Sequence, residues 1–219
     1  HPYRWATIGI SPEHIEQASI EEIHDFYQRF YHPSNAILSV SGDFESEKVF
    51  ALAEKWFGGI ADTQYPIAPI PQEPEQTEPR RLEVEREVPA TTIVIAFHMG
   101  NRRSHDFFLG DMTSDLLAGG DSARLYERLI KIKRMFASVN AYISGDVDNG
   151  MFVFTGQLLP TTTEAEAEAA FWEEIDELKS GKISDYELEK VKNKFEANTL
   201  FGELNVMNKA MNLGYYQMI

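Results

Sequence analysis

The segment Phe136–Leu158, with the sequence FASVNAYISGDVDNGMFVFTGQL, decides the fold that the sequence predicts. Residues 136–144 and 151–158 are rich in β-branched and aromatic side chains, as strands usually are. Before the second stretch stands Asn149-Gly150, a dipeptide that favours the tight turn of a β-hairpin. We therefore expect two antiparallel strands in this segment.

Pairs of strands and pairs of helices alternate around this hairpin. The order β-β-α-α-β-β-α-α predicts an α+β fold with a largely antiparallel sheet packed by helices. The expected elements are strands at 82–88 and 91–97, helices that begin at Ser104 and Ser122, a helix with an apolar face of Ala165, Ala169, Trp172, Ile175 and Leu178, and a long helix from the Ser184/Glu187 capping box.

The N-terminal part of the chain repeats the end of the same pattern. Ser19 and Glu22 form a capping box ahead of a helix with an apolar face. A short β-branched strand is expected at 36–41 (AILSVS), and a further helix begins at Ser46. This α-β-α order predicts two copies of one α/β unit, the first of them truncated.

A proline-rich stretch separates the two predicted units. Residues 62–80 contain five prolines, which are compatible neither with a helix nor with a central strand: Pro66, Pro69, Pro71, Pro74 and Pro79. We expect residues 1–61 to be the end of the first unit, 62–80 a semi-extended linker, and 81–219 the second unit, truncated at its C-terminus.

Composition excludes several classes of protein. The 219 residues include 35 acids and 20 bases, a net charge of −15 that disfavours nucleic acids and anionic membranes as partners. No stretch approaches the ~18 apolar residues of a membrane-spanning helix, so we expect no membrane insertion. The absence of cysteine excludes disulfides, thiolate metal sites and a cysteine nucleophile.

A search for catalytic chemistry finds no signature. A catalytic zinc needs about three side-chain ligands, two of them usually four residues apart on one helix, and no two histidines here have that spacing. Glu21 and His24 are three apart, but no second pair of this kind matches them. Gly-x-Ser-x-Gly and phosphate-binding glycine loops are also missing. We therefore assign no catalytic residue and no metal ligand to this chain.

One glycine-rich turn is a candidate contact site. Gly119 and Gly120 stand between two predicted helices, where their backbone amides could approach a ligand near a helix N-terminus. The other interpretation is a helix C-cap followed by an N-cap at Ser122. We take Gly119, Gly120, Ser122 and Arg124 as the residues that could contact a substrate or a partner.

Several segments together resemble the insulinase/pitrilysin family of zinc metallopeptidases, and in particular its bacterial members similar to mitochondrial processing peptidase. They follow the family's order over nearly the whole chain: His1-Pro2-Tyr3 with Ile8-Gly9, the run from Phe26 to Ala36 (FYQRFYHPSNA), Val40-Ser41-Gly42-Asp43, and the run from Leu116 to Tyr126 (LLAGGDSARLY).

The resemblance implies a parent protein that contains two metallohydrolase-like α/β units. These form half of a clam-shell chamber, and a second subunit or second half completes it around a peptide substrate. The family's zinc ligands and its glutamate general base lie upstream of the His-Pro-Tyr segment. The resemblance therefore implies zinc in the full-length parent, and no zinc and no peptidase activity in this chain alone.

Active members also use an arginine and a tyrosine, seven residues apart, that contact the substrate. The positions that align with them here are Ile130 and Ala137, and neither side chain can donate a hydrogen bond. That departure fits a zinc subunit without its metal-binding part. It fits equally a non-catalytic homologue similar to the core subunits of the cytochrome bc1 complex.

We interpret the chain as the chamber-forming, non-metal-binding fragment of a zinc-dependent endopeptidase. The alternatives are a non-catalytic structural homologue and a peptide-binding module that uses a sheet edge. We expect a soluble protein of the bacterial cytoplasm or periplasm. The sequence distinguishes neither these compartments nor the peptide specificity.

Overall fold

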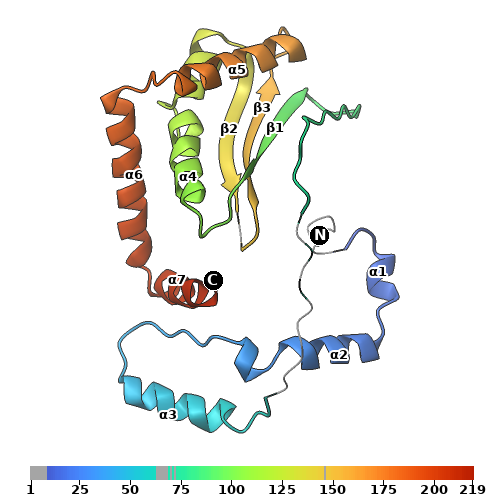
Figure 1. The fold of residues 1–219 in the computed structure, drawn as a ribbon, viewed down its shortest axis with the longest axis vertical. Coiled ribbons are helices and arrows are strands. Elements are labelled where there is room, and N and C mark those ends of the chain that lie inside the picture. Colours follow the sequence, from blue (N-terminus) through green and yellow to red (C-terminus); the bar gives the residue numbers. More distant parts are fainter. Residues whose placement is uncertain (1–8, 63–68, 70, 72, 146) are drawn as a thin grey trace. The chain divides into compact units, whose positions relative to one another are not determined.

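The computed structural model describes residues 9–62, 69, 71, 73–145 and 147–219 (Figure 1). Contacts divide the chain into unit 1, His1–Val84 with Lys209–Met218, and unit 2, Glu85–Asn208 with Ile219. The His1-Pro2-Tyr3 motif lies outside the described residues, as do positions 63–68, 70 and 72 of the expected linker. The division into 1–61, 62–80 and 81–219 remains a prediction.

Unit 2 is a three-stranded antiparallel sheet packed by helices, which confirms the α+β fold and the largely antiparallel sheet. Its strands lie in the order β1-β3-β2. In chain order the elements are β1 (Thr92–Met99), α4 (His105–Ala118), a π-helical turn (Tyr126–Ile132), β2 (Phe136–Ser144), β3 (Gly150–Leu158), α5 (Glu164–Lys179) and α6 (Asp185–Glu203).

The hairpin expected from the opening segment is present. β2 pairs with β3 from Ser144 opposite Met151 to Phe136 opposite Leu158, with a bulge between Phe136 and Ser138. β1 pairs with the other side of β3 in an uninterrupted register, from Thr92 opposite Gln157 to Met99 opposite Gly150.

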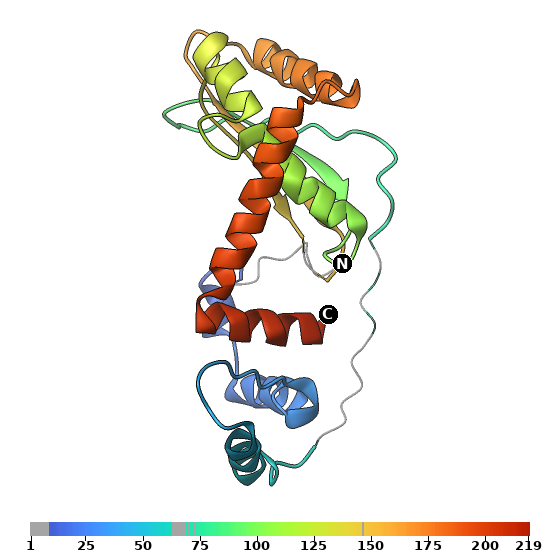
Figure 2. The same cartoon turned by 90° about the vertical axis from the view of Figure 1, so that its left-hand side faces the viewer.

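The core of unit 2 lies on one face of this sheet. The rings of Phe154 (β3) and Phe171 (α5) stack with their centroids 4.3 Å apart, and Phe136 meets Phe154 edge-on at 6.1 Å. A Cβ at Gly156 would lie 2.5 Å from the Phe136 ring, so this strand position requires glycine. α4 packs against β2 on the same side, and Figure 2 shows α6 running alongside α4.

The predicted apolar face of α5 was partly wrong. The buried residues are Ala167, Ala170, Phe171 and Glu174, whereas Ala165 and Ala169 are exposed. Trp172, Ile175 and Leu178 line the margin of the core. Alanine is small enough for either face of a helix, so the fully buried ring of Phe171 marks the face that is covered.

Two predicted strands do not form. Residues 36–41 and 82–88 lie outside any strand, and Leu82 is 86% exposed. A strand needs a neighbouring strand to satisfy its backbone groups, and no other segment among the described residues pairs with these two. Instead of an ordinary helix from Ser122, the chain forms the π-helical turn, after which Arg134 takes a positive φ of 52°.

Unit 1 contains helices without a core of their own. They are α1 (Glu13–Glu16), α2 (Ile20–Phe30), a 3-10 turn (Pro33–Asn35), α3 (Ser46–Phe57) and most of α7 (Val206–Met218). The capping box of α2 is present, because Glu22 N donates to Ser19 Oγ at 3.1 Å and Ser19 N donates to Glu22 Oε2 at 2.9 Å. None of these helices has a buried residue.

Phe171→Ala should lower the free energy of unfolding by about 3–5 kcal/mol, because it leaves a cavity in a fully buried site. Urea denaturation followed by circular dichroism measures this change. Phe108→Ala is the matched control: its ring is 45% exposed on α4, and its loss should cost at most about 1 kcal/mol. Equal costs for the two variants would contradict the assigned core.

Candidate functional site

The Gly119-Gly120 turn ends α4. Gly119 N donates to Asp115 O at 2.8 Å, and a Cβ at Gly119 would lie 2.4 Å from that same oxygen. Gly120 has φ +126°, a conformation that favours glycine. These observations support the helix C-cap interpretation. Ser122 does not act as the expected N-cap, because the next helical element, the π-helical turn, has Leu125 at that position without a side-chain cap.

Two lysines of α6 hold this turn. Lys194 Nζ donates to Asp115 Oδ1 at 2.7 Å and to Gly119 O at 3.0 Å. Lys190 Nζ donates to Ser122 O at 2.7 Å and lies 3.3 Å from Ser122 Oγ. Lys194 thereby places a positive charge at the C-terminus of α4, where the helix dipole favours one.

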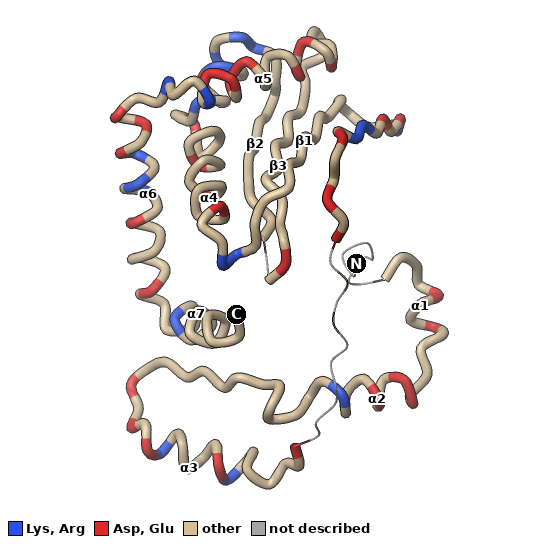
Figure 3. Tube along the Cα trace, viewed as in Figure 1, with Lys and Arg blue, Asp and Glu red and all other residues tan. Residues whose placement is uncertain are grey.

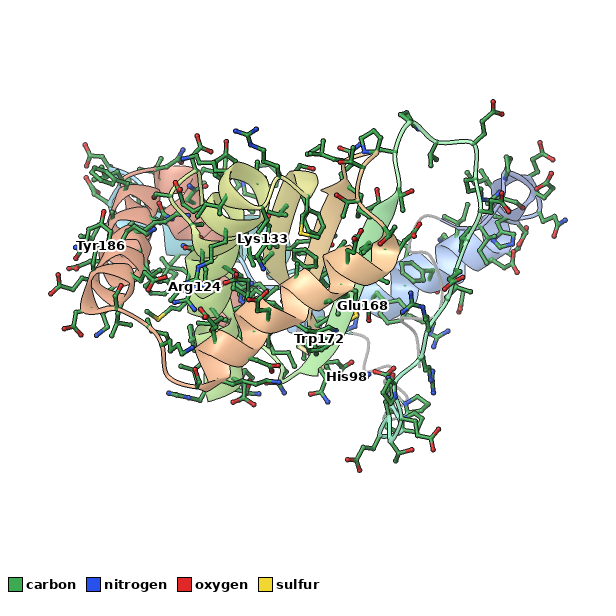
Figure 4. All side chains as sticks on the ribbon, turned by 90° about the horizontal axis from the view of Figure 1, so that it is seen from above. His98, Arg124, Lys133, Glu168, Trp172 and Tyr186 are labelled. Carbon is green, nitrogen blue, oxygen red and sulfur yellow. The ribbon has the colours of Figure 1, made fainter. Side chains whose placement is uncertain are left out.

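Arg124 is a buried anchor between the turn and α6, and Figure 4 shows it between α5 and α6. Its side chain is 1% exposed. Arg124 Nε donates to Glu187 Oε1 at 3.1 Å, and Nη2 donates to Oε1 at 3.0 Å, to Oε2 at 3.1 Å and to Lys182 O at 2.6 Å. Nη1 is buried without a hydrogen-bond partner.

Glu187 serves two structures at once. Besides Arg124, its Oε2 accepts from Ser184 N at 3.0 Å and from Ser184 Oγ at 2.9 Å, which forms the expected capping box of α6. Burial raises the pKa of this carboxyl, but the hydrogen bonds from Ser184 and Arg124 outweigh it and hold the pKa below its ordinary value. The start of α6 and the position of Arg124 are therefore coupled through one carboxylate.

A second arginine joins the π-helical turn to α5. Arg128 Nη1 donates to Glu174 Oε2 at 2.7 Å and also contacts Glu177 Oε2. Glu174 is 2% exposed, and burial raises its pKa although Arg128 opposes that shift. The hydrogen bond from Arg128 lowers the pKa of Glu177. Lys133 adds a third link to α5, with its Nζ 2.5 Å from Glu173 Oε2.

The four sequence-predicted contact residues lie close together along one segment. Gly119 and Gly120 form the turn, Ser122 is exposed with its carbonyl bound by Lys190, and Arg124 is held by Glu187. Their contact with a substrate or a partner stays a prediction. The structure assigns to this segment, residues 119–134, a connection to α5 and α6 through arginine and lysine side chains.

The two positions aligned with the family's Arg/Tyr pair differ in their burial. Ile130 belongs to the π-helical turn and packs against the core, whereas Ala137 is exposed at the bulge of β2. Among the described residues, no group of three or more His, Asp or Glu side chains could hold a metal ion. The donor set that the structure describes therefore does not fit a catalytic zinc.

Sequence reasoning missed the residues that fasten this segment. Lys190, Lys194 and Lys182 carry no motif, and their partners lie 58 to 79 residues away along the chain. Glu174 carried a usable signal, since it follows Phe171 by three residues and therefore shares the buried face of α5. An acid on an apolar face requires a cationic partner, which the structure identifies as Arg128.

Comparisons with known proteins agree on one family. The model of the family described as "Peptidase M16 inactive domain" matches residues 17–195. A zinc protease PqqE of Helicobacter pylori (strain ATCC 700392 / 26695) is 28% identical over 195 residues, which cover 88% of this chain and 44% of that protein. The chain thus spans less than half the length of this relative.

Solved structures share the fold. A protease from Helicobacter pylori matches with a TM-score of 0.89 and 26% identity over 100% of this chain and 53% of that chain. A peptidase M16 inactive domain from Pseudomonas fluorescens matches with a TM-score of 0.77 and 19% identity over 100% of this chain and 52% of the other. No helix in the described part of the chain has the length and apolar character needed to cross a bilayer.

Arg124→Ala should lower the free energy of unfolding by about 3 kcal/mol, because it leaves Glu187 partly buried without its cation. Thermal and urea denaturation measure the loss. Lys131→Ala is the matched control: Lys131 pairs with Glu127 four residues earlier at an exposed position, so its removal should cost about 0.5 kcal/mol or less. A loss from Arg124→Ala no larger than the control's would contradict the anchoring role.

Glu174 and Glu177 should make opposite contributions to the pH dependence of stability. The raised pKa of Glu174 gives a stabilising contribution that is complete below the ordinary glutamate pKa and is lost as pH rises through the raised value. The lowered pKa of Glu177 gives a contribution that is complete above the ordinary value and is lost as pH falls through the lowered one.

Glutamine variants test this pair. As the pH is lowered from 7 to about 3, the stability of Glu174→Gln relative to the unmodified chain should fall. The reason is that only the unmodified chain is stabilised when the carboxyl of Glu174 becomes protonated. The relative stability of Glu177→Gln should rise over the same range, because only the unmodified chain loses its charged partner. Urea denaturation at a series of pH values measures both trends, and two trends of the same sign would refute the assignment.

Proposed function

This chain belongs to the peptidase M16 inactive-domain family, and on that premise we propose that it is the chamber-forming, non-catalytic part of a zinc-dependent endopeptidase. The observation that carries the proposal is the match of the inactive-domain model to residues 17–195, in a chain that covers only 44% of a zinc protease. A polypeptide of that length has room for a second, metal-bearing half.

The exposed apolar side chains of the unit 1 helices support the proposal that another polypeptide covers this surface. α2 and α3 are amphipathic, yet neither buries a residue, and Trp56 is 67% exposed. On α2 the rings of Tyr27 and Tyr31 stack at 5.2 Å, and Phe26 lies 4.6 Å from Phe30. Contiguous exposed apolar side chains of this kind usually mark a surface that another polypeptide covers. We propose that the metal-bearing half covers it.

The chemistry then divides between the two halves. Zinc held by the other half would polarise the scissile carbonyl and lower the pKa of a bound water. The part supplied by this chain is the wall, whose segment 119–134 is fixed to α5 and α6 by Arg124, Arg128 and Lys133. Such fastening would keep the wall in place while a peptide binds.

A structural homologue without hydrolytic activity is the second candidate. Ile130 and Ala137 fit this candidate and the peptidase subunit equally, because neither side chain can donate the hydrogen bonds that the family's arginine and tyrosine give to a substrate. Both candidates require that another polypeptide covers the exposed helices of unit 1. They differ only in whether the completed assembly cleaves peptides.

Complementation tests the proposal. The rest of the full-length polypeptide, co-expressed as a separate chain, should bind residues 1–219 and shift the fluorescence of Trp56 to shorter wavelength, because the indole leaves water. Trp56→Phe is the control that should abolish most of the shift. A chain whose emission and melting temperature do not respond to this partner would contradict the proposed assembly.

A peptidase assay of the same complex with zinc separates the two candidates. Hydrolysis of a fluorogenic peptide by the complex, and by neither chain alone, is expected for the peptidase. A stable complex without hydrolysis would identify the structural homologue.

A further inference from the structure

The backbone of the π-helical turn does not match the pattern of its apolar residues. Leu125, Leu129 and Ile132 are spaced at i, i+4 and i+7, which places them on one face of an α-helix. In the structure Leu125 and Leu129 are fully buried, but Ile132 is 73% exposed. The sequence therefore has the pattern of an α-helix in a segment whose backbone is wound differently.

The wider winding of the turn explains why Ile132 is exposed. An α-helix has about 3.6 residues per turn, because each N–H bonds to the carbonyl four residues earlier. Here Lys133 N donates to Arg128 O, five residues earlier, at 2.8 Å. The longer step rotates each later side chain away from its α-helical direction. Ile132 therefore leaves the buried face, and Ile130 packs against the core instead.

The two isoleucines would exchange places if the turn adopted α-helical winding. At about 100° per residue, Ile132 returns to within about 20° of the direction of Leu125, and Ile130 lies about 140° away from it. The same kind of side chain then packs against the core in either winding. Burial of an isoleucine therefore does not decide between the two windings, and other contacts do.

Two contacts at the surface favour the π winding. Lys133 Nζ lies 2.5 Å from Glu173 Oε2 on α5, and Lys131 Nζ lies 5.2 Å from the centre of the Tyr126 ring, five residues earlier. Residues five apart are neighbours along a π-helix, whereas the neighbours along an α-helix are three or four apart. α-Helical winding would also turn Lys133 away from Glu173. Both contacts are therefore specific to the π winding.

Backbone strain opposes the π winding. π-Helices are rare, and they occur mostly as short interruptions of α-helices, frequently at functional sites. Directly after this one, Arg134 has a φ of 52°, which is unfavourable for a residue with a Cβ. No other residue except glycine has a positive φ in the part of the chain that the structure describes. The surface contacts thus offset a strained backbone.

We propose that residues 126–134 form a conformational switch with two windings, in which Ile130 and Ile132 exchange between the core and the solvent. Lys133 holds the π winding, and Figure 3 shows the basic residues of this turn beside the acidic residues of α5. Glu173 is 63% exposed, so salt screens its attraction to Lys133. Low ionic strength therefore favours the π winding, with Ile132 at the surface, and high ionic strength favours the α winding, with Ile130 there.

Cysteine labelling reports which isoleucine is exposed, because the chain contains no cysteine. Ile130→Cys and Ile132→Cys are made separately, and the rate of reaction of each with uncharged N-ethylmaleimide is measured at low salt. Ile132→Cys should react at least tenfold faster than Ile130→Cys. Tyr186→Cys, at a position of α6 that is 72% exposed, gives the rate of a freely exposed thiol. Equal rates for the two isoleucine positions would contradict the π winding.

Lys133→Ala removes the contact with Glu173 and should change the two rates in opposite directions. We expect Ile132→Cys to react at least threefold more slowly and Ile130→Cys at least threefold faster. Lys179→Ala is the matched control: it removes the same charge from an exposed ion pair with Asp176, and it should change neither rate. Raising NaCl from about 50 mM to about 1 M should reproduce the opposite changes without Lys133→Ala, because salt screens the pair.

Opposite changes distinguish a switch from a turn that only loosens. Local unfolding would expose both cysteines and raise both rates, and altered acidity of the thiols would also move both rates in one direction. A rigid turn would change neither rate. Each of these results overturns the proposal. Circular dichroism and melting curves show whether every variant folds.

Nuclear magnetic resonance couplings across hydrogen bonds identify the winding in the unmodified chain, where no substitution can prevent folding. The coupling of Lys133 N should lead to the carbonyl carbon of Arg128 at low salt and to that of Leu129 at high salt. Coupling to Arg128 under both conditions would refute the exchange. Neither measurement involves a peptide, a metal or another polypeptide, so their outcome is independent of the proposed assembly.

Discussion

The stacking of Phe171 on Phe154 determines which side of the sheet is covered. With the two rings 4.3 Å apart, α5 lies against the face that also carries Ile95 and Ala141. α4 packs on the same face, so the helices of unit 2 bury one side of the strands and leave the other open. The covered core and the open face are therefore two consequences of one packing arrangement.

Charge is distributed in a way that complements this arrangement. The strands carry no Asp, Glu, Lys or Arg, and the ion pairs of Arg124, Arg128 and Lys133 join segment 119–134 to α5 and α6. Apolar contacts thus hold the helices to the sheet, while charged contacts hold the helices and the turn to one another. Glu187 is central to the second set, because its carboxylate both begins α6 and fixes Arg124.

The two units differ in how much apolar surface their own residues bury. Unit 2 has a contiguous core, which includes the fully buried Phe136, Phe154 and Phe171. The helices of unit 1 bury nothing, although α2 and α3 have the amphipathic pattern of helices that pack. An amphipathic pattern indicates that the apolar face of a helix is covered, but it does not identify the segment that covers it. The proposed assembly with a metal-bearing half supplies that cover.

The sequence by itself determined the elements that depend on local chemistry. The capping boxes at Ser19 and Ser184, the hairpin through Asn149-Gly150 and the end of α4 at Gly119 formed as predicted, because each is specified by neighbours a few residues apart. The resemblance to the family was also readable in the sequence, and the match of the family model to residues 17–195 confirmed the family.

Only the tertiary structure decided which faces are buried and which charges pair. Residues 36–41 and 82–88 have the composition of strands, but a strand forms only where a partner supplies its hydrogen bonds, and none was available to them among the described residues. Arg124 pairs with Glu187, which lies 63 residues away in the sequence, and Arg128 pairs with Glu174, which lies 46 residues away. Such distances along the chain are closed by packing, which no local pattern of residues encodes.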